Sequence, residues 1–441
     1  MEFKSYPNYK DSGVEWLGKV PEHWRISSLK RYGYFKGGAG FPHAYQGNTE
    51  ENIPFFKVNS LSKDKRFLSS FSDFVGEETA KKLGAKIFPK NSIFFAKVGA
   101  ALLLERIRTN QQPCCIDNNM MGFVIQNELS FDFAFYLMSL IDFKYLVNPG
   151  AVPSINESQI SSFLISVPPI SEQTQIANYL DTETARIDNL ISKQEKLIEL
   201  LEEQRKSIIS HAVTKGLNPN APMKDSGVEW LGKVPNDWNL SRLDAVSKIV
   251  RGNSAFSKMD LLESGKYVAL QYGKTYKVNE INESFGSYVN QEFFKKSQIT
   301  EFGDIILIST SETLEDLGHS CFYARHDVGL IGGEQFLLKP KNQNFGKYIY
   351  YATKAFSSYL QRYATGLKVF RFNLDDLKKI YIPDISLVEQ QKIAEFLDKE
   401  TARIDISVLK QKSLIEKLKE YRSSIISHAV TGKIDVREFG A

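Results

Sequence analysis

The feature that most constrains the fold is a long helical segment that occurs twice. Residues 171–216 contain the runs ETARID and SIISHAVT, and both runs recur in residues 386–433. The offset is 217 residues for both runs, so the two copies align without a gap. Two copies are too few for a solenoid. They indicate a chain built as two related halves.

A shorter segment is also repeated. The sequence KDSGVEWLGKVP fills residues 10–21 and returns unchanged at residues 224–235. The central helix runs directly into the second copy, whereas no copy follows the C-terminal helix. We therefore expect the two ends of the chain to meet, near the junction of Gly216 and Lys224. The protein would then close into a pseudo-twofold ring, and its two long helices would run antiparallel.

Both long segments carry helix signals. Neither Pro nor Gly interrupts residues 171–215, and at 1.5 Å per residue each helix would be roughly 60 Å long. Ser171 is the expected N-cap of the first helix. In the second copy Ser386 and Glu389 form a capping box, and Gly432 gives the C-terminal stop.

Apolar residues recur at seven-residue spacing in both helices, which is typical of a coiled-coil seam. They are Leu180, Ile187, Leu201 and Ile208 in the first helix, and Leu397, Ile404, Leu418 and Ile425 in the second. Glutamine replaces the central member of each series, at Gln194 and Gln411. We expect these two side chains to meet at the pseudodyad and to fix the helix register, unless both amides face solvent.

Between the repeats lie two regions of about 140 residues, 25–167 and 239–382, which share an order of elements but little sequence. Each has buried strands at equivalent places (53–58 and 267–271, then 90–98 and 302–310) and an aromatic helix (131–147 and 348–363). Ile155-Asn156 in the first region corresponds to Phe372-Asn373 in the second. The fold class is therefore α/β (α+β), with two homologous domains whose surfaces have diverged.

Composition excludes several classes of protein. No apolar run approaches the roughly 18 residues of a membrane span, so we expect a cytoplasmic protein. Cys114, Cys115 and Cys321 have no metal-ligand spacing and are expected to be small buried hydrophobes. Net charge is only +4, but residues 30–108 hold fourteen Lys and Arg against seven Asp and Glu. That local excess suits a phosphate-binding face, and an ordinary solvated surface explains it equally well.

The organisation resembles the specificity subunit of Type I restriction-modification enzymes over essentially the full chain. The residues that carry the resemblance are the EQ-x-x-IA starts at residues 172–177 and 389–394, ETARID, and SG-x-EWLG-x-VP in both copies. The resemblance implies two target-recognition domains held apart by two antiparallel conserved helices, in a circular arrangement. The domain boundaries are then 1–24 (conserved segment), 25–167 (first recognition domain), 168–238 (central conserved region), 239–382 (second recognition domain) and 383–441 (C-terminal conserved region).

The resemblance also implies function and partners. Each recognition domain reads one half of a split, asymmetric site on double-stranded DNA. Two modification subunits dock on the helices and methylate adenine with S-adenosylmethionine, and restriction subunits add ATP- and Mg-dependent translocation and cleavage. The chain itself would hold no cofactor, no metal and no catalytic residue. In agreement, no adenine-methylating Pro-Pro-aromatic signature and no Walker A loop occurs in the sequence.

Candidate DNA contacts are basic or polar residues in loops beside the expected strands. In the first domain they are Lys36, Lys57, Asn59, Lys63, Lys65, Arg66 and Lys97, and in the second Arg251, Tyr272, Lys274, Lys277, Lys368 and Arg371. The alternative function is a non-enzymatic two-domain scaffold that binds protein or glycan partners. Failure to bind DNA in the presence of a modification subunit would favour it.

Overall fold

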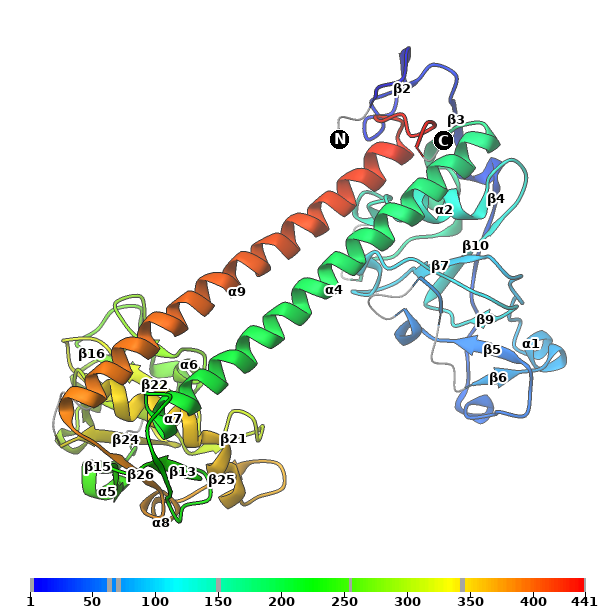
Figure 1. Ribbon diagram of the computed structural model, residues 1–441. Coiled ribbons are helices and arrows are strands. Elements are labelled where there is room, and N and C mark those ends of the chain that lie inside the picture. The colour runs from blue at the N-terminus through cyan, green and yellow to red at the C-terminus, as the bar shows by residue number, and fades with distance from the viewer. Residues whose placement is uncertain are drawn as a thin grey trace. The chain divides into compact units, whose positions relative to one another are not determined.

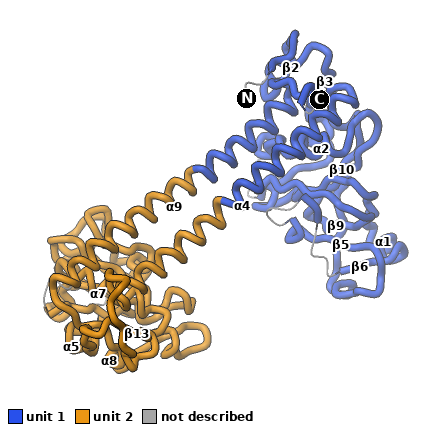
Figure 2. Tube along the Cα trace, in the orientation of Figure 1, with its two compact units in different colours: residues 1–193, 414–441 blue, residues 194–413 orange. Residues whose placement is uncertain are grey.

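The computed structural model of the chain describes residues 4–61, 66–68, 73–147, 152–253, 256–341 and 346–439. The chain divides into unit 1, residues 1–193 with 414–441, and unit 2, residues 194–413 (Figure 2). Two long helices, α4 (Ile170–Lys215) and α9 (Leu387–Val430), contribute to both units (Figure 1). The prediction of two long repeated helices is confirmed.

The helices run antiparallel within each unit. In unit 2 Arg205 of α4 pairs with Asp405 of α9, and further along α4 Val213 joins a core cluster that contains Ile393. In unit 1 Arg422 Nε donates to Asp188 Oδ1 at 2.9 Å. Five of the eight heptad residues are among the buried hydrophobic side chains: Leu180, Ile187, Leu397, Ile404 and Ile425. The apolar seam therefore buries the helices against one another and against their domains.

The Arg205–Asp405 ion pair also bears on the predicted glutamine contact. Gln194 precedes Arg205 by eleven residues, whereas Gln411 follows Asp405 by only six. In an antiparallel pair the two amides are thus offset by five residues, about 7 Å along the axis. Both glutamines are half-buried, and the described contacts include no hydrogen bond between them. This geometry argues against a direct contact, and we assign the register to the ion pairs.

The helix ends match the expected chemistry in part, since the described contacts show only the Ser386 half of the predicted capping box and Glu389 accepts from Trp238 Nε1 instead. Ser386 accepts from the backbone N–H of Glu389 at 3.3 Å, and Gly432 has φ 71°, the left-handed conformation of a helix stop. The predicted N-cap Ser171 is wrong, because α4 begins one residue earlier, at Ile170. The carbonyl of Pro169 accepts from the N–H groups of Glu172 and Gln173 and closes the first turn.

Each unit contains a hairpin formed largely by the short repeat, which is β1 (Tyr9–Asp11) with β2 (Lys19–Pro21) in unit 1 and β12 (Met223–Asp225) with β13 (Lys233–Pro235) in unit 2. The first and last strands of each recognition domain then pair: β3 (Arg25–Ser28) with β11 (Leu164–Val167), and β14 (Asn239–Arg242) with β26 (Tyr381–Asp384). Each predicted domain therefore begins and ends at one two-stranded ladder beside a long helix.

The recognition domain of unit 1 is a mixed α/β fold. One sheet has the order β4-β10-β7-β8 and is antiparallel, and a second has the order β6-β5-β9, in which β5 and β9 are parallel. Three short helices accompany them. The bounds are β4 (Gly33–Gly37), β5 (Ile53–Phe56), β6 (Phe74–Val75), α1 (Glu77–Lys82), β7 (Ile93–Ala96), β8 (Arg108–Thr109), β9 (Cys115–Ile116), β10 (Met120–Ile125), α2 (Phe131–Met138) and α3 (Glu157–Ser161).

Unit 2 repeats this plan with additions. Its sheets have the orders β15-β24-β20-β22-β17 and β18-β16-β23-β19, and β21 pairs with β25. The strands are β15 (Ser247–Arg251), β16 (Tyr267–Leu270), β17 (Glu280–Ile281), β18 (Tyr288–Val289), β19 (Ile299–Thr300), β20 (Ile305–Ile308), β21 (Thr310–Ser311), β22 (Ser320–Tyr323), β23 (Gly329–Ile331), β24 (Gln335–Pro340) and β25 (Phe370–Arg371). The helices are α5 (Leu243–Val246), α6 (Tyr272–Thr275), α7 (Gly346–Leu360) and α8 (Leu374–Lys378).

The aromatic helices differ in how well their limits were predicted. Helix α7 matches the expected span 348–363 closely, whereas α2 ends at Met138 rather than at residue 147. The reason is that Asp142 accepts from the backbone N–H of Lys144 and starts a separate turn at Phe143–Tyr145. The three cysteines are buried free thiols, as expected.

The two ends of the chain meet, as the ring requires. The backbones of Lys4 and Asp435 form an antiparallel β-bridge. Lys433 Nζ donates to the carbonyl of Leu17 at 2.7 Å and to that of Lys19. Both ends lie in unit 1, whereas Gly216 and Lys224 belong to unit 2, so the predicted place of closure is wrong. The contact that closes the ring in unit 1 has an equivalent in unit 2. There Lys215 Nζ contacts the carbonyls of Leu231 and Lys233, as Lys433 Nζ contacts those of Leu17 and Lys19.

None of the helices within the described ranges combines the length and apolar character that a membrane span needs.

Candidate nucleic-acid interface

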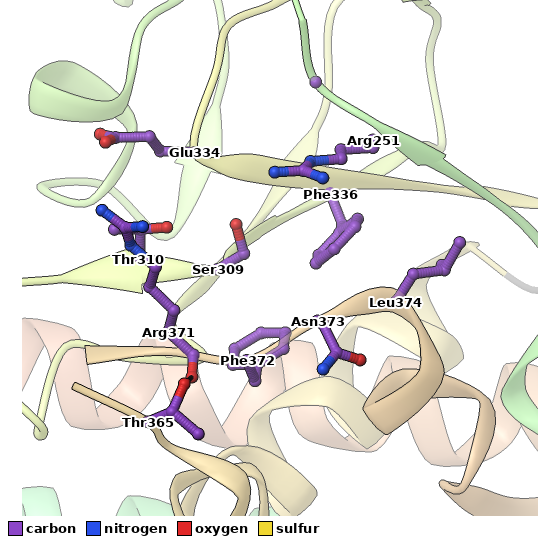
Figure 3. Close-up of a pocket in the computed structure, with 11 residues that line it drawn as sticks. Arg251, Ser309, Thr310, Glu334, Phe336, Thr365, Arg371, Phe372, Asn373 and Leu374 are labelled. Atoms are coloured by element: carbon purple, nitrogen blue, oxygen red, sulfur yellow. Dashed lines mark hydrogen bonds between the residues drawn. The ribbon is translucent and has the colours of Figure 1, made fainter. Parts of the chain in front are cut away.

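One cleft among the described residues lies in unit 2, where β15 and β20 end and β24 begins, beside the loop that enters α8. It has a volume of about 440 Å³ (Figure 3). Its wall combines two arginines, one carboxylate, hydroxyls and two phenylalanine rings. The lining residues are Arg251, Gly252, Ser309, Thr310, Glu334, Phe336, Thr365, Arg371, Phe372, Asn373 and Leu374.

Backbone pairing fixes the two arginines in this cleft. Arg251 is the last residue of β15 and lies opposite Phe336 of β24, and Arg371 pairs with Thr310. Gly252 follows Arg251, and a Cβ atom there would lie 1.9 Å from the carbonyl oxygen of Gly332, so only glycine fits. Both arginines are exposed, and the described contacts include no ion pair for either guanidinium. Two unneutralised cations therefore face solvent at the rim of one cleft.

Glu334 adds an acceptor to the same cleft. Its side chain is exposed and lines the pocket, and its backbone has φ 62°. A left-handed conformation is costly for a residue other than glycine, and Asn91, Glu105 and Asn127 share it among the described residues. Figure 3 shows the Glu334 carboxylate and the two guanidinium groups around the same opening.

The first domain has the same framework. The N–H of Gly38 donates to the carbonyl of Met120, as that of Gly252 does to Gln335. The N–H of Ile155 donates to the carbonyl of Lys97, as that of Phe372 does to Ser309. The correspondence of Ile155 with Phe372 is thus confirmed. By this register five cleft positions correspond in pairs, namely Gly37 and Arg251, Lys97 and Ser309, Asn119 and Glu334, Ser154 and Arg371, and Glu157 and Leu374.

In unit 1 this place holds lysines and an acid. Lys36 Nζ lies 3.5 Å from Glu157 Oε1, which also accepts from the N–H of Gly37 at 2.9 Å. A Cβ atom added at Gly37 would lie 2.7 Å from Lys97 Nζ, so the two predicted lysines Lys36 and Lys97 are brought together at the end of β4. Asn119 is exposed beside them.

Comparison with known proteins identifies the family of this chain. Residues 21–200 and 235–417 each match the Type I restriction modification DNA specificity domain, which covers most of the chain. The chain belongs to the Type I DNA specificity family. Specificity subunits are DNA-recognition components rather than enzymes.

Two relatives named as specificity subunits support the assignment. The chain is 26% identical to the putative type I restriction enzyme MjaX specificity subunit of Methanocaldococcus jannaschii, over 99% of both chains. It is 24% identical to the EcoKI specificity subunit of Escherichia coli over 46% of this chain and 44% of that protein.

Two solved structures share the fold. One belongs to a study of complex assembly and conformational transition of the type I R-M system, with a TM-score of 0.71 at 14% identity, covering 93% of this chain and 98% of that one. The other is the HsdS subunit from Thermoanaerobacter tengcongensis, with a TM-score of 0.55 at 15% identity, covering 94% and 98%.

Other predicted contact residues of the specificity subunit lie nearby with their own partners. Lys57 follows β5 and pairs with Asp73 at 2.9 Å and with Gln46 at 3.1 Å, over the ring of Phe41. Asn59 is exposed in the next turn. Lys63 and Lys65 lie outside the described residues.

Arg66 has a different environment from the one predicted. It pairs with Asp132 of α2 and, at 3.0 Å, with Asp181 of α4, and its guanidinium lies 4.6 Å from the centre of the Phe135 ring. Its charge is therefore neutralised inside the protein, which argues for a structural role. Asp132 is distant in sequence, so residue type and loop position alone gave no sign of this contact.

In unit 2 the remaining predicted residues fall into two groups. Tyr272 stacks on Tyr276 in and after α6, with ring centres 5.6 Å apart, and Lys274 and Lys277 are exposed beside them. Lys368 is exposed near the tip of the hairpin that carries Arg371, where Gly366 has φ 114°. These two groups lie on segments adjoining the strands that form the cleft.

Asn119, Ser309 and Glu334 are candidate functional residues that the sequence analysis missed. Asn119 and Glu334 occupy the turn before β10 and β24, and nothing in their local sequence marks the turns as equivalent. The only signal was a polar residue directly before a buried strand, which is common at any strand end.

Proposed function

We propose that each domain reads one half of a split, asymmetric DNA site, with the side chains at the ends of β4, β7 and β10 in unit 1 and with the cleft at the ends of β15, β20 and β24 in unit 2. The observation that carries the proposal is that these two places share their backbone hydrogen bonds but differ in side chains at every paired position given above. A common scaffold with different donors and acceptors suits two readers with different targets.

The chemistry of each cleft suggests what it reads. Arg251 and Arg371 have the planar donor pattern that suits the O6 and N7 acceptors of guanine, and Glu334 suits the amino group of cytosine. Asn119, at the equivalent place in unit 1, suits adenine. Lys36, Lys57, Lys97, Lys274, Lys277 and Lys368 would neutralise phosphates and position the duplex rather than specify its sequence. In this proposal Asn59 and Tyr272 also face the DNA, and Lys63 and Lys65 remain candidates on sequence grounds alone.

The long helices would set the spacing of the two half-sites and dock two modification subunits, which bind S-adenosylmethionine. Restriction subunits, with ATP and Mg²⁺, would complete the complex in the cytoplasm. The support comes from the relatives, which are named as specificity subunits of type I restriction enzymes, and from the structural neighbour described in terms of complex assembly. The chain itself would then recognise the DNA and bind no cofactor.

The test is long-read mapping of methylated adenine in DNA from cells that express this chain with its modification subunit. We expect a split, non-palindromic motif. Exchanging residues 25–167 for the equivalent domain of a relative should change one half of the motif and leave the other half unchanged. Absence of any motif, with the complex assembled and S-adenosylmethionine present, would favour a protein- or glycan-binding scaffold instead.

A further inference from the structure

A glutamate near the start of each long helix lies beside a hairpin, Glu172 in unit 1 and Glu389 in unit 2. In unit 1 the space around this glutamate is filled by side chains. The Glu172 carboxylate near the start of α4 is only 4% exposed and has three partners. Tyr6 Oη donates to it at 2.5 Å, Trp24 Nε1 at 3.1 Å, and His23 Nε2 lies 2.8 Å away. A buried carboxylate needs such donors, because an unsatisfied one is costly.

The C-terminal tail covers the same place. Val436 is buried against Tyr6 and Trp24 in the core of unit 1, and Phe439 packs edge-on against Tyr179 of α4 at 4.7 Å. The Arg437 guanidinium lies 4.9 Å from the centre of the Tyr6 ring. The Tyr6 phenol is thus enclosed by a carboxylate, apolar side chains and a cation, and burial with the Glu172 bond raises its pKa, so it stays a donor.

The equivalent place in unit 2 is open. Glu389 of α9, the repeat partner of Glu172, is half-buried and accepts from Trp238 Nε1 at 3.1 Å, with no second side-chain donor among the described contacts. A pocket of about 480 Å³ lies beside it, lined by Leu217, Asn218, Ser386, Val388, Glu389, Lys392 and Ile393.

The two backbones match, so the difference lies in side chains. The N–H of Glu22 donates to the carbonyl of Asn8, and that of Asn236 to the carbonyl of Pro222, which aligns residues 4–9 with 218–223. Asn220 therefore stands where unit 1 has Tyr6, and it is exposed. Unit 2 also lacks a tail at this place, because the chain continues from α4 into the hairpin.

Apolar side chains that line the pocket, and Phe396 further along α9, lack the cover that unit 1 provides. Phe396 of α9 is the repeat partner of Tyr179 and is 38% exposed, whereas Tyr179 is 4% exposed. Val388 is 64% exposed and Leu217 is 43% exposed. An aromatic body would bury this apolar wall, and a hydroxyl at its tip would give Glu389 the donor that Tyr6 gives Glu172.

We propose that this pocket receives a tyrosine side chain from a modification subunit, in the position that Tyr6 takes in unit 1. The phenol would donate to Glu389, and Lys392 on the pocket wall would face the ring as Arg437 faces Tyr6. The choice of partner rests on the proposed function. The choice of tyrosine rests on the filled copy of the same site.

The test measures binding of the modification subunit to the full chain with three variants. Asn220→Tyr should plug the pocket from within the chain, and Glu389→Ala should remove the acceptor. We expect each to weaken binding of one modification subunit by about tenfold or more, as truncation of a central contact does. Asn220→Ala is the matched control, since it leaves the pocket open and should bind as the unaltered chain does.

Crosslinking identifies the occupant directly. A photoreactive benzoylphenylalanine at Val388 should capture a tyrosine-containing peptide of the modification subunit. Capture of a second copy of this chain would overturn the choice of partner. Unchanged binding by both Asn220→Tyr and Glu389→Ala would overturn the inference and leave the proposed function standing, whereas failure of the unaltered chain to bind any modification subunit would contradict the proposed function itself.

Discussion

At the residue scale, equivalent positions in the two domains show how the same backbone supports different chemistry. Position 119 in the first domain and position 334 in the second each precede an equivalent buried strand, yet one is an amide and the other a carboxylate. Glu334 has a left-handed backbone, and its carbonyl accepts from the N–H of Ser309. Its exposed side chain has no partner in the protein among the described contacts, so its carboxylate is available to an amino group of DNA.

Replacing Glu334 by glycine tests this explanation. Relief of the left-handed strain and the extra freedom of the unfolded chain should nearly cancel, so we expect the free energy of unfolding to change by less than about 1 kcal/mol. Discrimination at one base pair of one half-site should weaken by about 1–3 kcal/mol. Thermal unfolding and methylated-adenine mapping measure the two effects, with the exposed loop variant Glu315→Ala as control. An unchanged motif would rule out a reading role for Glu334.

At the element scale, each recognition domain is tied to a long helix by the same contact. Tyr136 of α2 donates to Asp181 of α4 at 2.6 Å, and Tyr351 of α7 donates to Asp398 of α9 at 2.7 Å. A cation accompanies each pair, Arg66 in unit 1 and Lys347 in unit 2. The two aspartates are repeat partners, whereas the cations come from different elements of their domains. The aspartate acceptor is thus the same in both long helices, whereas the cation beside it comes from a different part of each domain.

Removing one hydroxyl tests the strength of this contact. Tyr351→Phe should lower the free energy of unfolding by about 1–2 kcal/mol, because the hydrogen bond to a carboxylate is lost within a largely buried contact. Denaturant unfolding of the full chain measures the effect. A double-mutant cycle with Asp398→Asn should show the two changes to be coupled. Tyr381→Phe, at an exposed tyrosine, is the control and should change stability by less than about 0.5 kcal/mol. Equal effects of Tyr351→Phe and Tyr381→Phe would contradict the assignment.

These elements also show what the sequence could predict. The helices and the ends of both domains follow from the repeats, because a repeated pattern indicates a repeated structure. Arg251 and Arg371 were found from loop position and charge, and they do line the cleft. Arg66 fitted the same rule yet pairs with Asp132 and Asp181, and Asn119 and Glu334 fitted no rule. Such side-chain environments depend on contacts between residues far apart in the chain, which local spacing does not encode.

At the scale of the whole molecule, the two junctions differ in covalent connection but share one set of hydrogen bonds. A lysine at the end of each long helix contacts two backbone carbonyls of a hairpin, Lys215 in unit 2 and Lys433 in unit 1. The polypeptide is thus continuous at one junction and open at the other, while equivalent lysine–carbonyl contacts are present at both.

A circularly permuted chain tests this equivalence. Joining residue 439 to Lys4 by a short flexible linker and opening the chain between Asn218 and Lys224 should preserve the fold and the methylation motif, since Lys4 already pairs with Asp435. We expect the melting temperature to fall by only a few degrees, because no core side chain is removed. Circular dichroism and adenine-methylation mapping check the result. A permuted chain that fails to fold would show that the order of connection matters beyond these contacts.

The closure of unit 1 has a consequence for how the protein folds. Its core includes Tyr6 and Trp24, which are close to Lys4 in the sequence, and Ile434 and Val436, which follow α9. Unit 2, residues 194–413, is one continuous stretch that contains every residue of its own core cluster. Unit 1 therefore completes its core only after two segments far apart in the chain have come together, and such long-range closure is slow. Until that moment the Glu172 pocket stands open, as its counterpart in unit 2 does in the finished protein.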